Sequence, residues 1–587
     1  MKPQELAAED YELSDTSSPR GQDVEPLLPR YERHEGSSSR TTTTPLRSPS
    51  ERRRARFRHA ISCLCLCLLI IVPSFGFMGC WFGKQTIDKV KTWDQLPPDW
   101  KEWLEQYAPN KGADHVNFPT DIGFAGPTPT GSEAALLVTA PALPLFTGVA
   151  PLVPPDVKAK HGANVMHSWG NLSPFHSVDS HGLPESSSII PEGCELEELH
   201  WLQRHGARYP TTQADGPAGI AARLKASSGW KAKGELSFLN QWDYKLGAEV
   251  LTPFGRQQLF NLGVSARLKY GFLLDKMKGR LPVFRTETQD RMLKSAQNFA
   301  TGFFGYPAEE SYNLEVMIES PGFNCTLAPW NACKIRNDTS YAIAFKEMAK
   351  WDAVFLKDAH NRLKGKMEGY DLSLKDVKDF MEMCAYETVA LGYSSFCNLF
   401  TAKEWKGFEY RNDIFWWYTS SFGYPQARAQ GKGWAQELLS RLTHTRLTTF
   451  DSTTNSTFHD DIRFPLHDSL YVDFTHDTQF ALILPTLNLT SFAESGAPPT
   501  DHIPKHWSFV ASKFCPFATN LQVQVLSCPA KPSPKQIRIV LNDAPVPLGG
   551  INGCGEDDEG LCPFDNFVGS VQELVNGVDF TESCVGV

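Results

Sequence analysis

The sequence contains a run, Arg204-His205-Gly206-Ala207-Arg208-Tyr209-Pro210, in which a histidine lies between two arginines at the end of an apolar stretch. Arginine presents a planar fork of donors that matches the oxygens of a phosphoryl group. The glycine after the histidine lets the backbone turn sharply and a substrate come close. The run therefore predicts a phosphate site in which Arg204 and Arg208 bind the phosphoryl group and His205 attacks phosphorus.

The two arginines are also expected to act on the histidine itself. Guanidinium groups beside His205 should lower its pKa, because they disfavour the imidazolium form. A histidine that stays neutral in acid keeps the lone pair needed for attack on phosphorus. The run is therefore compatible with an enzyme that works at acidic pH.

From about residue 195 onward, short apolar runs alternate with helical stretches, which is typical of an α/β domain. We expect strands at Leu199–Gln203, Leu281–Phe284 and Leu470–Phe474. Polar or charged residues follow each of them, and open α/β sheets bind ligands at the carboxyl ends of their strands. The Arg-His-Gly run, Arg285 and His476-Asp477 are therefore expected to meet at one site.

A proton donor is harder to choose, because the dipeptide His-Asp occurs three times, at His459-Asp460, His467-Asp468 and His476-Asp477. Only the third follows an alternating apolar strand and precedes an apolar, helix-like run, Phe480–Leu484. Asp460 and Asp468 stay open as alternatives. An aspartate in the position of Asp477 could also serve only as a helix cap.

Further segments lie in a fixed order around these residues. They are His167-Ser168-Trp169-Gly170, Ser173-Pro174-Phe175, Leu251-Thr252-Pro253-Phe254-Gly255, Phe396-Cys397-Asn398-Leu399-Phe400 and Phe474-Thr475-His476-Asp477. Together with the Arg-His-Gly run, this order resembles the histidine acid phosphatases, the branch of the histidine phosphatase superfamily that includes the secreted fungal phytases. The resemblance extends over roughly residues 160 to 587.

The resemblance implies an α/β fold with a mainly parallel central sheet flanked by helices. It also implies an inserted smaller helical domain, to which the helical spacing between about residues 340 and 445 would belong. By its position after a strand, Arg285 matches the third phosphate-binding arginine of the family, although a solvent-facing residue at a helix start is the alternative. His476 would help to hold the phosphate. Asp477 would protonate the leaving oxygen and later activate water, and the mechanism needs no metal or cofactor.

Ten cysteines follow residue 82, an even number that suits disulfides in an oxidising compartment. The resemblance suggests the pairs Cys194–Cys528, Cys384–Cys397 and Cys554–Cys562. It leaves four unassigned, namely Cys325, Cys333, Cys515 and Cys584. Four more, Cys63, Cys65, Cys67 and Cys80, lie in or beside an apolar segment and are expected to be filler or palmitoylation sites rather than metal ligands.

That apolar segment, residues 60–82, has no charged side chain and is long enough to cross a bilayer. Arginines cluster on its N-terminal side, which by the positive-inside rule places residues 1–59 in the cytoplasm. We expect a single-pass type II signal anchor with residues 83–587 in a lumen or outside the cell. A cleaved signal peptide, giving a secreted protein, is the alternative. The Asn-x-Ser/Thr glycosylation sequences agree, since all follow the segment: Asn171, Asn324, Asn337, Asn455 and Asn488.

Composition divides the chain into four parts. Residues 1–59 are rich in Ser, Thr, Arg and Glu and are expected to be disordered. Residues 60–82 form the anchor, residues 83–160 a Pro-rich stem, and residues 161–587 the phosphatase domain. The net charge of −10 makes nucleic acid an unlikely partner and requires local arginines to attract phosphate.

We interpret the chain as an acid phosphatase that hydrolyses small-molecule phosphate monoesters, phytate included, through a phosphohistidine at His205. A specialised phytase is one alternative, but Thr211–Gly216 stands where phytate-degrading members often carry lysines. A catalytically inactive phosphate-binding membrane glycoprotein of the same fold is another. A type II membrane glycosyltransferase would leave the Arg-His-Gly run unexplained. The sequence does not distinguish a vacuolar or other endomembrane location from the cell surface, and it leaves the oligomeric state open.

Overall fold

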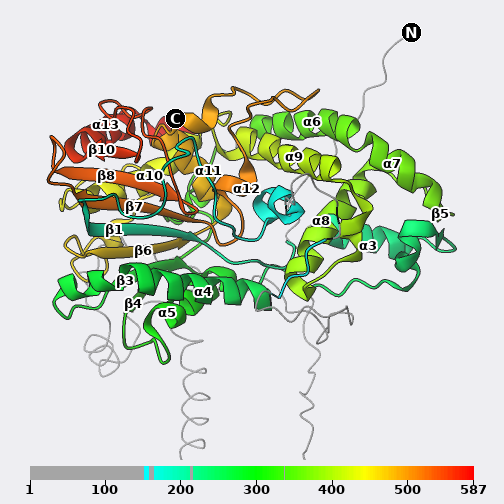
Figure 1. Ribbon diagram of the computed structural model, residues 1–587, viewed down its shortest axis with the longest axis horizontal. Helices are drawn as coiled ribbons and strands as arrows, with labels where there is room; N and C mark the ends of the chain where they lie inside the picture. The colour runs from blue at the N-terminus through cyan, green and yellow to red at the C-terminus, as the bar shows by residue number, and fades with distance from the viewer. Residues whose placement is uncertain (1–150, 156, 158–163, 212–215, 336–337, 587) are drawn as a thin grey trace, which may run out of the picture. The chain divides into compact units, whose positions relative to one another are not determined.

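The structure is a computed structural model that describes residues 151–155, 157, 164–211, 216–335 and 338–586 (Figure 1). The expected cytoplasmic tail, the apolar segment 60–82 and most of the stem lie outside the described residues. Within the described part of the chain, no helix has the length and apolar character needed to span a membrane.

The central sheet is mixed, which corrects the expectation of a mainly parallel one. Its strands follow the order β10-β8-β7-β1-β6-β3-β4. The strands on one side run parallel, namely β1 (Glu195–Arg204), β6 (Leu470–Thr475), β3 (Val283–Glu287) and β4 (Asn313–Met317). The other strands run antiparallel to their neighbours, namely β7 (Asn520–Ser527), β8 (Lys535–Leu541), β9 (Ala544–Pro545) and β10 (Leu561–Pro563). The connection from Ser527 to Lys535 is too short for the crossover that parallel strands need.

Helices cover both faces of this sheet. One face carries α4 (Pro253–Tyr270) and α5 (Asp290–Phe304), and the other carries α10 (Ala427–Leu442), α11 (Asp477–Thr486) and α13 (Phe564–Asn576). Side chains of β1 alternate between the two cores, so that Trp201 packs toward Phe299 of α5 while Leu202 joins the opposite cluster. Helices α4 and α5 approach closely, since a Cβ at Gly263 would lie 2.1 Å from the Phe299 carbonyl oxygen.

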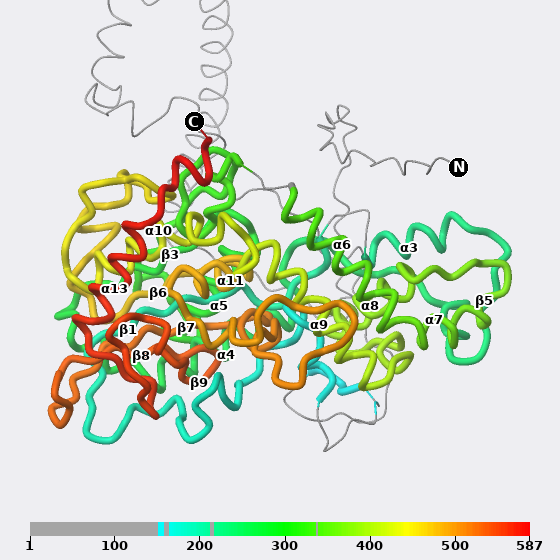
Figure 2. Tube along the Cα trace, turned by 90° about the horizontal axis from the view of Figure 1, so that it is seen from above, coloured from blue at the N-terminus to red at the C-terminus, as the bar shows by residue number. Residues whose placement is uncertain are grey.

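A helix-rich part lies beside the sheet in both views (Figures 1 and 2). It comprises α3 (Gly216–Ala226), α6 (Asp338–Phe355), α7 (Lys357–Leu363), α8 (Leu374–Leu391), α9 (Ala402–Ser420) and the small β2–β5 sheet (Lys231–Ala232 with Met367–Glu368). Capping boxes at Ser373 and Thr401 begin α8 and α9. The segment 151–155 also belongs to the fold, because Leu152 is buried in the helical core. The expected helical range 340–445 is helical, but its last helix, α10, packs beside the sheet on α11 and α13.

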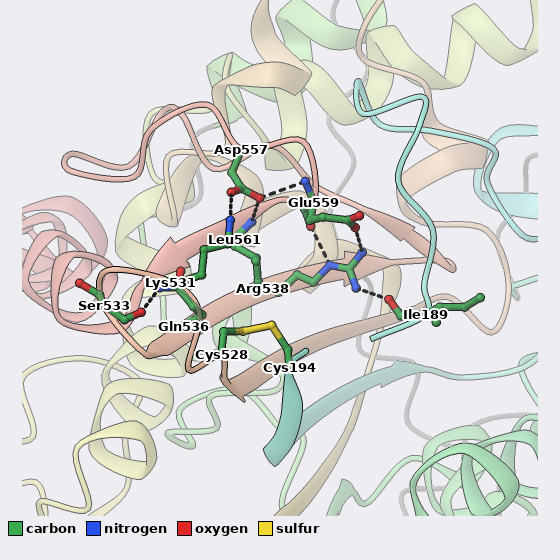
Figure 3. Close-up of a disulfide and its surroundings, with 10 residues drawn as sticks. All are labelled: Ile189, Cys194, Cys528, Lys531, Ser533, Gln536, Arg538, Asp557, Glu559 and Leu561. Carbon is green, nitrogen blue, oxygen red and sulfur yellow. Dashed lines mark hydrogen bonds and ion pairs between the residues drawn. A yellow bond between two sulfur atoms is a disulfide. The ribbon is translucent and has the colours of Figure 1, made fainter. Parts of the chain in front are cut away.

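Four disulfides link the described residues. The three suggested pairs, Cys194–Cys528, Cys384–Cys397 and Cys554–Cys562, are confirmed. Of the four unassigned cysteines, Cys333 pairs with Cys584, whereas Cys325 and Cys515 are buried free thiols. Figure 3 shows the first bond, which joins the adjacent ends of β1 and β7, together with Arg538 of β8, which donates to the Ile189 carbonyl at 2.7 Å. The bond ties the segment before β1 to the antiparallel side of the sheet.

Candidate active site

The Arg-His-Gly run begins at Arg204, the last residue of β1, and is held by backbone packing against the start of α4. A Cβ at Gly206 would lie 2.2 Å from the Gly255 carbonyl oxygen, and a Cβ at Gly255 would lie 1.9 Å from the Ala207 carbonyl oxygen. Only glycine fits at either position. Thr252 caps α4 by accepting from the Gly255 N–H at 3.0 Å, and its own N–H donates to the Ala207 carbonyl at 2.9 Å. The Leu-Thr-Pro-Phe-Gly segment therefore fixes the loop that presents the histidine.

His205 is buried, and its hydrogen bonds determine which ring nitrogen is available. Its backbone N–H donates to the Thr475 carbonyl at 3.1 Å, next to the end of β6. Its Nδ1 lies 2.8 Å from the Gly206 carbonyl oxygen, which can only accept. Nδ1 must therefore carry the proton, and in the neutral ring Nε2 holds the lone pair.

The surroundings of His205 keep the ring neutral. Burial is the largest cause of a pKa well below the ordinary value, and the charges of Arg204, Arg291, His476 and Arg208 add to it. The direction agrees with the expectation from the sequence, but desolvation contributes more than the arginines do. The neutral ring, with Nε2 unprotonated, is therefore favoured at this position.

Arg204 is fully buried and its guanidinium is fixed in orientation. One terminal nitrogen donates to the carbonyl oxygens of Asn171 at 2.6 Å and Cys515 at 2.5 Å, and the other donates to Asp477 Oδ2 at 2.6 Å. The guanidinium also stacks over Phe517, with 4.6 Å to the ring centroid. Arg204 thus connects the nucleophile loop to the first residue of α11.

Asp477 accepts at both of its carboxylate oxygens. Oδ2 receives Arg204 and the Asn171 side-chain amide, the latter at 2.9 Å, while Oδ1 receives the Thr478 N–H at 3.0 Å. Burial would raise the pKa of Asp477, but Arg204, Arg208 and the hydrogen bond from Asn171 outweigh it and hold the pKa below its ordinary value. Asp477 is therefore a carboxylate in this state, and it must gain a proton before it can donate one.

A buried glutamate on α9 braces the two segments that accept from Arg204. Glu409 accepts from the Gly170 N–H at 2.7 Å and from the Ser512 N–H at 2.8 Å. Gly170 precedes Asn171, and Ser512 belongs to the short helix α12 (Ala511–Phe514) that precedes Cys515. The carboxylate of Glu409 thus holds both carbonyl acceptors in place.

His476 lies beside His205 in the opposite protonation state. Its Nε2 donates to Glu287 Oε2 at 2.8 Å and to Glu319 Oε2 at 3.0 Å, and its ring meets that of His205 edge-on at 5.4 Å. Burial would lower the pKa of His476, but the two carboxylates outweigh it and raise the pKa to about 9. An imidazolium cation therefore adjoins a neutral imidazole.

Arg208 connects the site to the helix-rich part. It donates to the Tyr209 carbonyl at 3.0 Å and to the Tyr386 hydroxyl at 3.3 Å. Tyr386 belongs to α8, and its ring lies under the guanidinium with 5.9 Å to the centroid. The site therefore lies where α8 meets the carboxyl ends of the parallel strands.

Arg285 does not share the surroundings of these residues. It is fully buried and forms a two-pronged pair with Asp473 at 2.7 and 2.7 Å and a further ion pair with Glu437 at 2.9 Å. The sequence analysis ended the strand at Phe284, whereas β3 continues to Glu287, so Arg285 lies inside the sheet rather than at its edge. These contacts argue against the expected role in phosphate binding.

Arg291 occupies the position that Arg285 was expected to fill. It lies in the first turn of α5, is largely buried, and donates to Glu249 Oε2 at 2.9 Å. Its charge ranks next to that of Arg204 among those that lower the pKa of His205, and it also faces Arg208. The sequence analysis missed it, although the first turn of the helix after a parallel strand is a place where such folds bind ligands.

The comparisons with known proteins agree with this geometry. The family model described as histidine phosphatase superfamily (branch 2) matches residues 195–542. Phytase A of Aspergillus awamori is 31% identical over 431 residues, which cover 71% of this chain and 90% of that protein. Phytase A of Aspergillus terreus is 32% identical over 421 residues, covering 68% and 87%. The chain belongs to the histidine phosphatase superfamily.

A solved structure supports the fold of this branch 2 member. The crystal structure of the phytase from D. castellii superposes with a TM-score of 0.60 at 24% identity, covering 72% of this chain and 88% of that one. As a histidine phosphatase, the chain is a phosphoric monoester hydrolase. This assignment excludes the glycosyltransferase alternative.

One expected glycosylation acceptor is instead part of the phosphatase site. The side-chain nitrogen of Asn171, to which a glycan would be attached, donates to Asp477, and the Asn171 carbonyl accepts from Arg204. Asn171 is therefore not a suitable acceptor, which corrects the expectation. Its place in the His-Ser-Trp-Gly segment was the signal available in the sequence.

The other two His-Asp pairs have different partners. Asp460 accepts from the Arg463 side chain at 2.6 Å near the surface, and Asp468 pairs with Arg280 at 2.5 Å. Asp477, by contrast, accepts from Arg204 of the Arg-His-Gly run at 2.6 Å. The structure thus favours Asp477 as the aspartate of the site.

The sequence analysis expected a mechanism that needs no metal. Among the described residues, one group does bring three potential ligand atoms within 4.8 Å of one another, namely Glu287, Glu319 and His476. Glu287 ends β3, Glu319 follows β4 and His476 follows β6, so no short spacing in the sequence could have revealed the group.

Proposed function

We propose that the chain hydrolyses phosphate monoesters in two displacements through a phosphohistidine at His205. Nε2 forms a bond to phosphorus while the bond from phosphorus to the ester oxygen breaks, and Asp477 gives its proton to the departing alcohol. Water then attacks phosphorus and gives a proton to Asp477 as the P–N bond breaks and phosphate leaves. The observation that carries the proposal is a neutral His205 surrounded by cationic groups.

Four cationic groups would stabilise the transferred phosphoryl group. Arg204, Arg208, Arg291 and His476 all act electrostatically on His205. Cations fixed around the nucleophile stabilise charge on the equatorial oxygens without rearranging during the reaction. A catalytically inactive binding protein would not need a neutral nucleophile beside a proton carrier, and this set of groups therefore favours an enzyme.

The substrate itself would help Asp477 to act as an acid. Arg204 and Arg208 hold its pKa down in the empty site. A bound phosphate monoester brings negative charge that offsets both arginines, and this raises the pKa of a neighbouring carboxyl group. Asp477 would thus take up a proton when the substrate binds in acid.

We propose a broad range of monoester substrates that includes phytate. The similarity to proteins named phytase A supports phytate as one substrate. The segment Thr211–Gly216, without lysine, supports breadth over specialisation for phytate. The part of that segment at residues 212–215 lies outside the described residues.

Phosphate release by the detergent-solubilised full chain tests this function. We expect acidic turnover of phytate, glycerophosphate and nitrophenyl phosphate, unaffected by a chelator and lost in His205→Ala. Activity on phytate alone would show a specialised phytase instead of an enzyme with a broad range of monoester substrates. Full activity in His205→Ala would refute the mechanism, and no activity on any ester would favour the inactive alternative.

We also propose that residues 1–59 are cytoplasmic and that the catalytic domain faces a lumen or the exterior. The arginines before residue 60, the position of the glycosylation sequences and four disulfides among the described residues support this orientation. In sealed microsomes, added protease should remove only the tail. Digestion of the catalytic domain would reverse the orientation, and a soluble product starting near Lys84 would establish a cleaved signal.

A further inference from the structure

Three ionisable side chains meet at the carboxyl edge of the parallel strands. Glu287 is the last residue of β3, Glu319 follows β4, and His476 follows β6. Their backbones are held together, because the Thr288 N–H donates to the Met317 carbonyl at 2.9 Å and the Glu319 N–H donates to the Thr288 hydroxyl at 3.0 Å. These hydrogen bonds therefore fix the two glutamates relative to each other.

The two carboxylates share one donor. His476 Nε2 lies within hydrogen-bond distance of both glutamates, yet it carries a single proton. Both glutamates are buried, and one carboxylate oxygen of each lies within 4.8 Å of the other and of a His476 ring nitrogen. Two unprotonated carboxylates at this separation would repel strongly in a low-dielectric interior. One further proton between them removes the repulsion.

The pKa values of the two glutamates are shifted in opposite directions, as a shared proton requires. Burial and the charge of Glu319 raise the pKa of Glu287. Burial would also raise the pKa of Glu319, but His476 outweighs it and leaves the pKa below its ordinary value. The Gln289 side-chain amide donates to Glu319 Oε1 at 2.9 Å, which further favours the charged form there.

We propose that Glu287 and Glu319 are positioning residues that share one proton and together hold His476 as an oriented imidazolium cation. This inference rests on the proposed role of His476 in phosphate binding. With Nε2 bound to the glutamates, Nδ1 is the nitrogen left to donate to a phosphoryl oxygen. The pair thus supplies a fixed positive charge next to a neutral nucleophile.

Other charged or titratable groups face the cluster from every adjoining element. They are His205 after β1, Arg291 in α5, Cys325 in the loop after β4, and Asp477 in α11. Arg291 is a cation on whose pKa the charge of Glu319 acts. A proton fits this crowded, partly cationic setting better than a divalent metal ion, although the same three side chains offer metal-ligand atoms.

If the two glutamates share a proton, either one alone should be able to hold His476 as an imidazolium. In Glu287→Gln, Glu319 still provides one carboxylate for His476. In Glu319→Gln, Glu287 no longer faces a second carboxylate and ionises in its place. Each single variant should therefore retain the imidazolium, and only Glu287→Gln/Glu319→Gln should lose it. The exposed Glu310, changed to Gln, is the matched control.

The experiment combines histidine-selective NMR titration of the solubilised full chain with binding of inorganic phosphate as a function of pH. We expect the double variant to lower the pKa of His476 by at least two units. It should also weaken phosphate binding at pH 7 roughly tenfold to a hundredfold. Each single variant should change either quantity by far less than half of the change in the double variant. An unchanged titration of His476 in the double variant would overturn the proposal.

Two further outcomes separate the alternatives. If metal analysis of the wild type finds one divalent ion per chain and each single variant loses it, the cluster is a metal site and the proton-sharing proposal fails. If the double variant lowers the pKa of His476 but leaves phosphate binding unchanged, the proton-sharing pair stands and the proposed role of His476 in phosphate binding fails. The titration does not require turnover, so it remains informative even if His205 is not the nucleophile.

Discussion

Two groups of arginines lie in or beside the central sheet and differ in how their charge is compensated. Arg285 and Arg441 share the carboxylate of Asp473, at 2.7 and 2.8 Å, and both stack on the ring of Phe464. Glu437 adds a second carboxylate on Arg285. We call this the compensated group. Arg204, Arg208 and Arg291 form the uncompensated group around His205.

Among the described residues, each arginine of the uncompensated group has at most one carboxylate at ion-pair distance, which is Asp477 for Arg204 and Glu249 for Arg291. Arg204 binds two carbonyl oxygens and one carboxylate, and Arg208 binds a carbonyl oxygen and a hydroxyl group. Positive charge left over in this way lowers the pKa of His205 and can be offset by a phosphoryl group. Because burying an unpaired charge is costly, such an excess marks a site that a substrate completes.

The largest effect is expected for Asp477, the carboxylate that pairs with Arg204. Asp477→Asn cannot protonate an alkoxide, so phosphorylation of the enzyme by glycerophosphate should slow by roughly 10² to 10⁴. A nitrophenyl ester has a good leaving group and should be affected much less in the same step. Single-turnover kinetics with both esters measure this difference. Equal losses for both would assign Asp477 a role in holding Arg204 rather than in proton transfer.

Arginine replacements in the two groups should have opposite consequences. Arg291→Ala should lower kcat/KM by roughly 10² to 10³, since one fixed cation is lost from the transition state. Its effect on the free energy of unfolding should stay within about 1 kcal/mol, because Arg291 lies at a helix start with a single ion pair. Steady-state kinetics and urea denaturation measure both quantities.

Arg285→Ala is the matched variant in the compensated group. It leaves Asp473 and Glu437 buried with less positive charge, so the free energy of unfolding should fall by about 3–5 kcal/mol. Molecules that remain folded should keep their kcat. A folded Arg285→Ala enzyme with kcat/KM reduced as much as in Arg291→Ala would restore Arg285 to the phosphate site.

A smaller effect concerns acid stability. Burial would raise the pKa of Glu437, but Arg285 and His459 outweigh it and lower the pKa to about 2. A carboxyl group whose pKa falls on folding stabilises the protein above its ordinary pKa, and this stabilisation is lost as the pH drops toward 2. Glu437→Gln should therefore cost roughly 3 kcal/mol at neutral pH and flatten the loss of stability between about pH 5 and 2.

Urea denaturation across pH measures this change, with Glu310→Gln as the exposed control. The kcat at the optimum should not change, because Glu437 belongs to the compensated group. An unchanged slope below pH 5 would show that other carboxylates account for the acid sensitivity.

Much of the site was predictable because its chemistry lies in local patterns. His205 and Arg204 form one run, and β6 and α11 flank Asp477 as the apolar pattern indicated. Arg285 was chosen, and Arg291 was missed, because the apolar pattern does not locate the end of β3. The strand β3 continues for three residues beyond Phe284, so Arg285 lies inside the sheet. Arg291 is the arginine that follows the end of the strand.

Contacts between distant segments were not predictable from the sequence. Asn171 reaches Asp477 across 306 positions, and Glu319 reaches His476 across 157. The antiparallel half of the sheet was also missed, since periodicity distinguishes strands from helices but does not give strand direction. The short connection between β7 and β8 was the one local feature of the sequence that indicated antiparallel strands.

The central claim is that His205 becomes phosphorylated, and trapping the intermediate tests it most directly. The solubilised full chain would be mixed rapidly with a labelled phosphate ester, quenched in alkali or in acid, and digested for peptide mapping. The account predicts label on the peptide that contains His205 after alkaline quenching, its loss in acid, and no label in His205→Ala. Normal labelling of His205→Ala, or label on a different residue, would contradict the account.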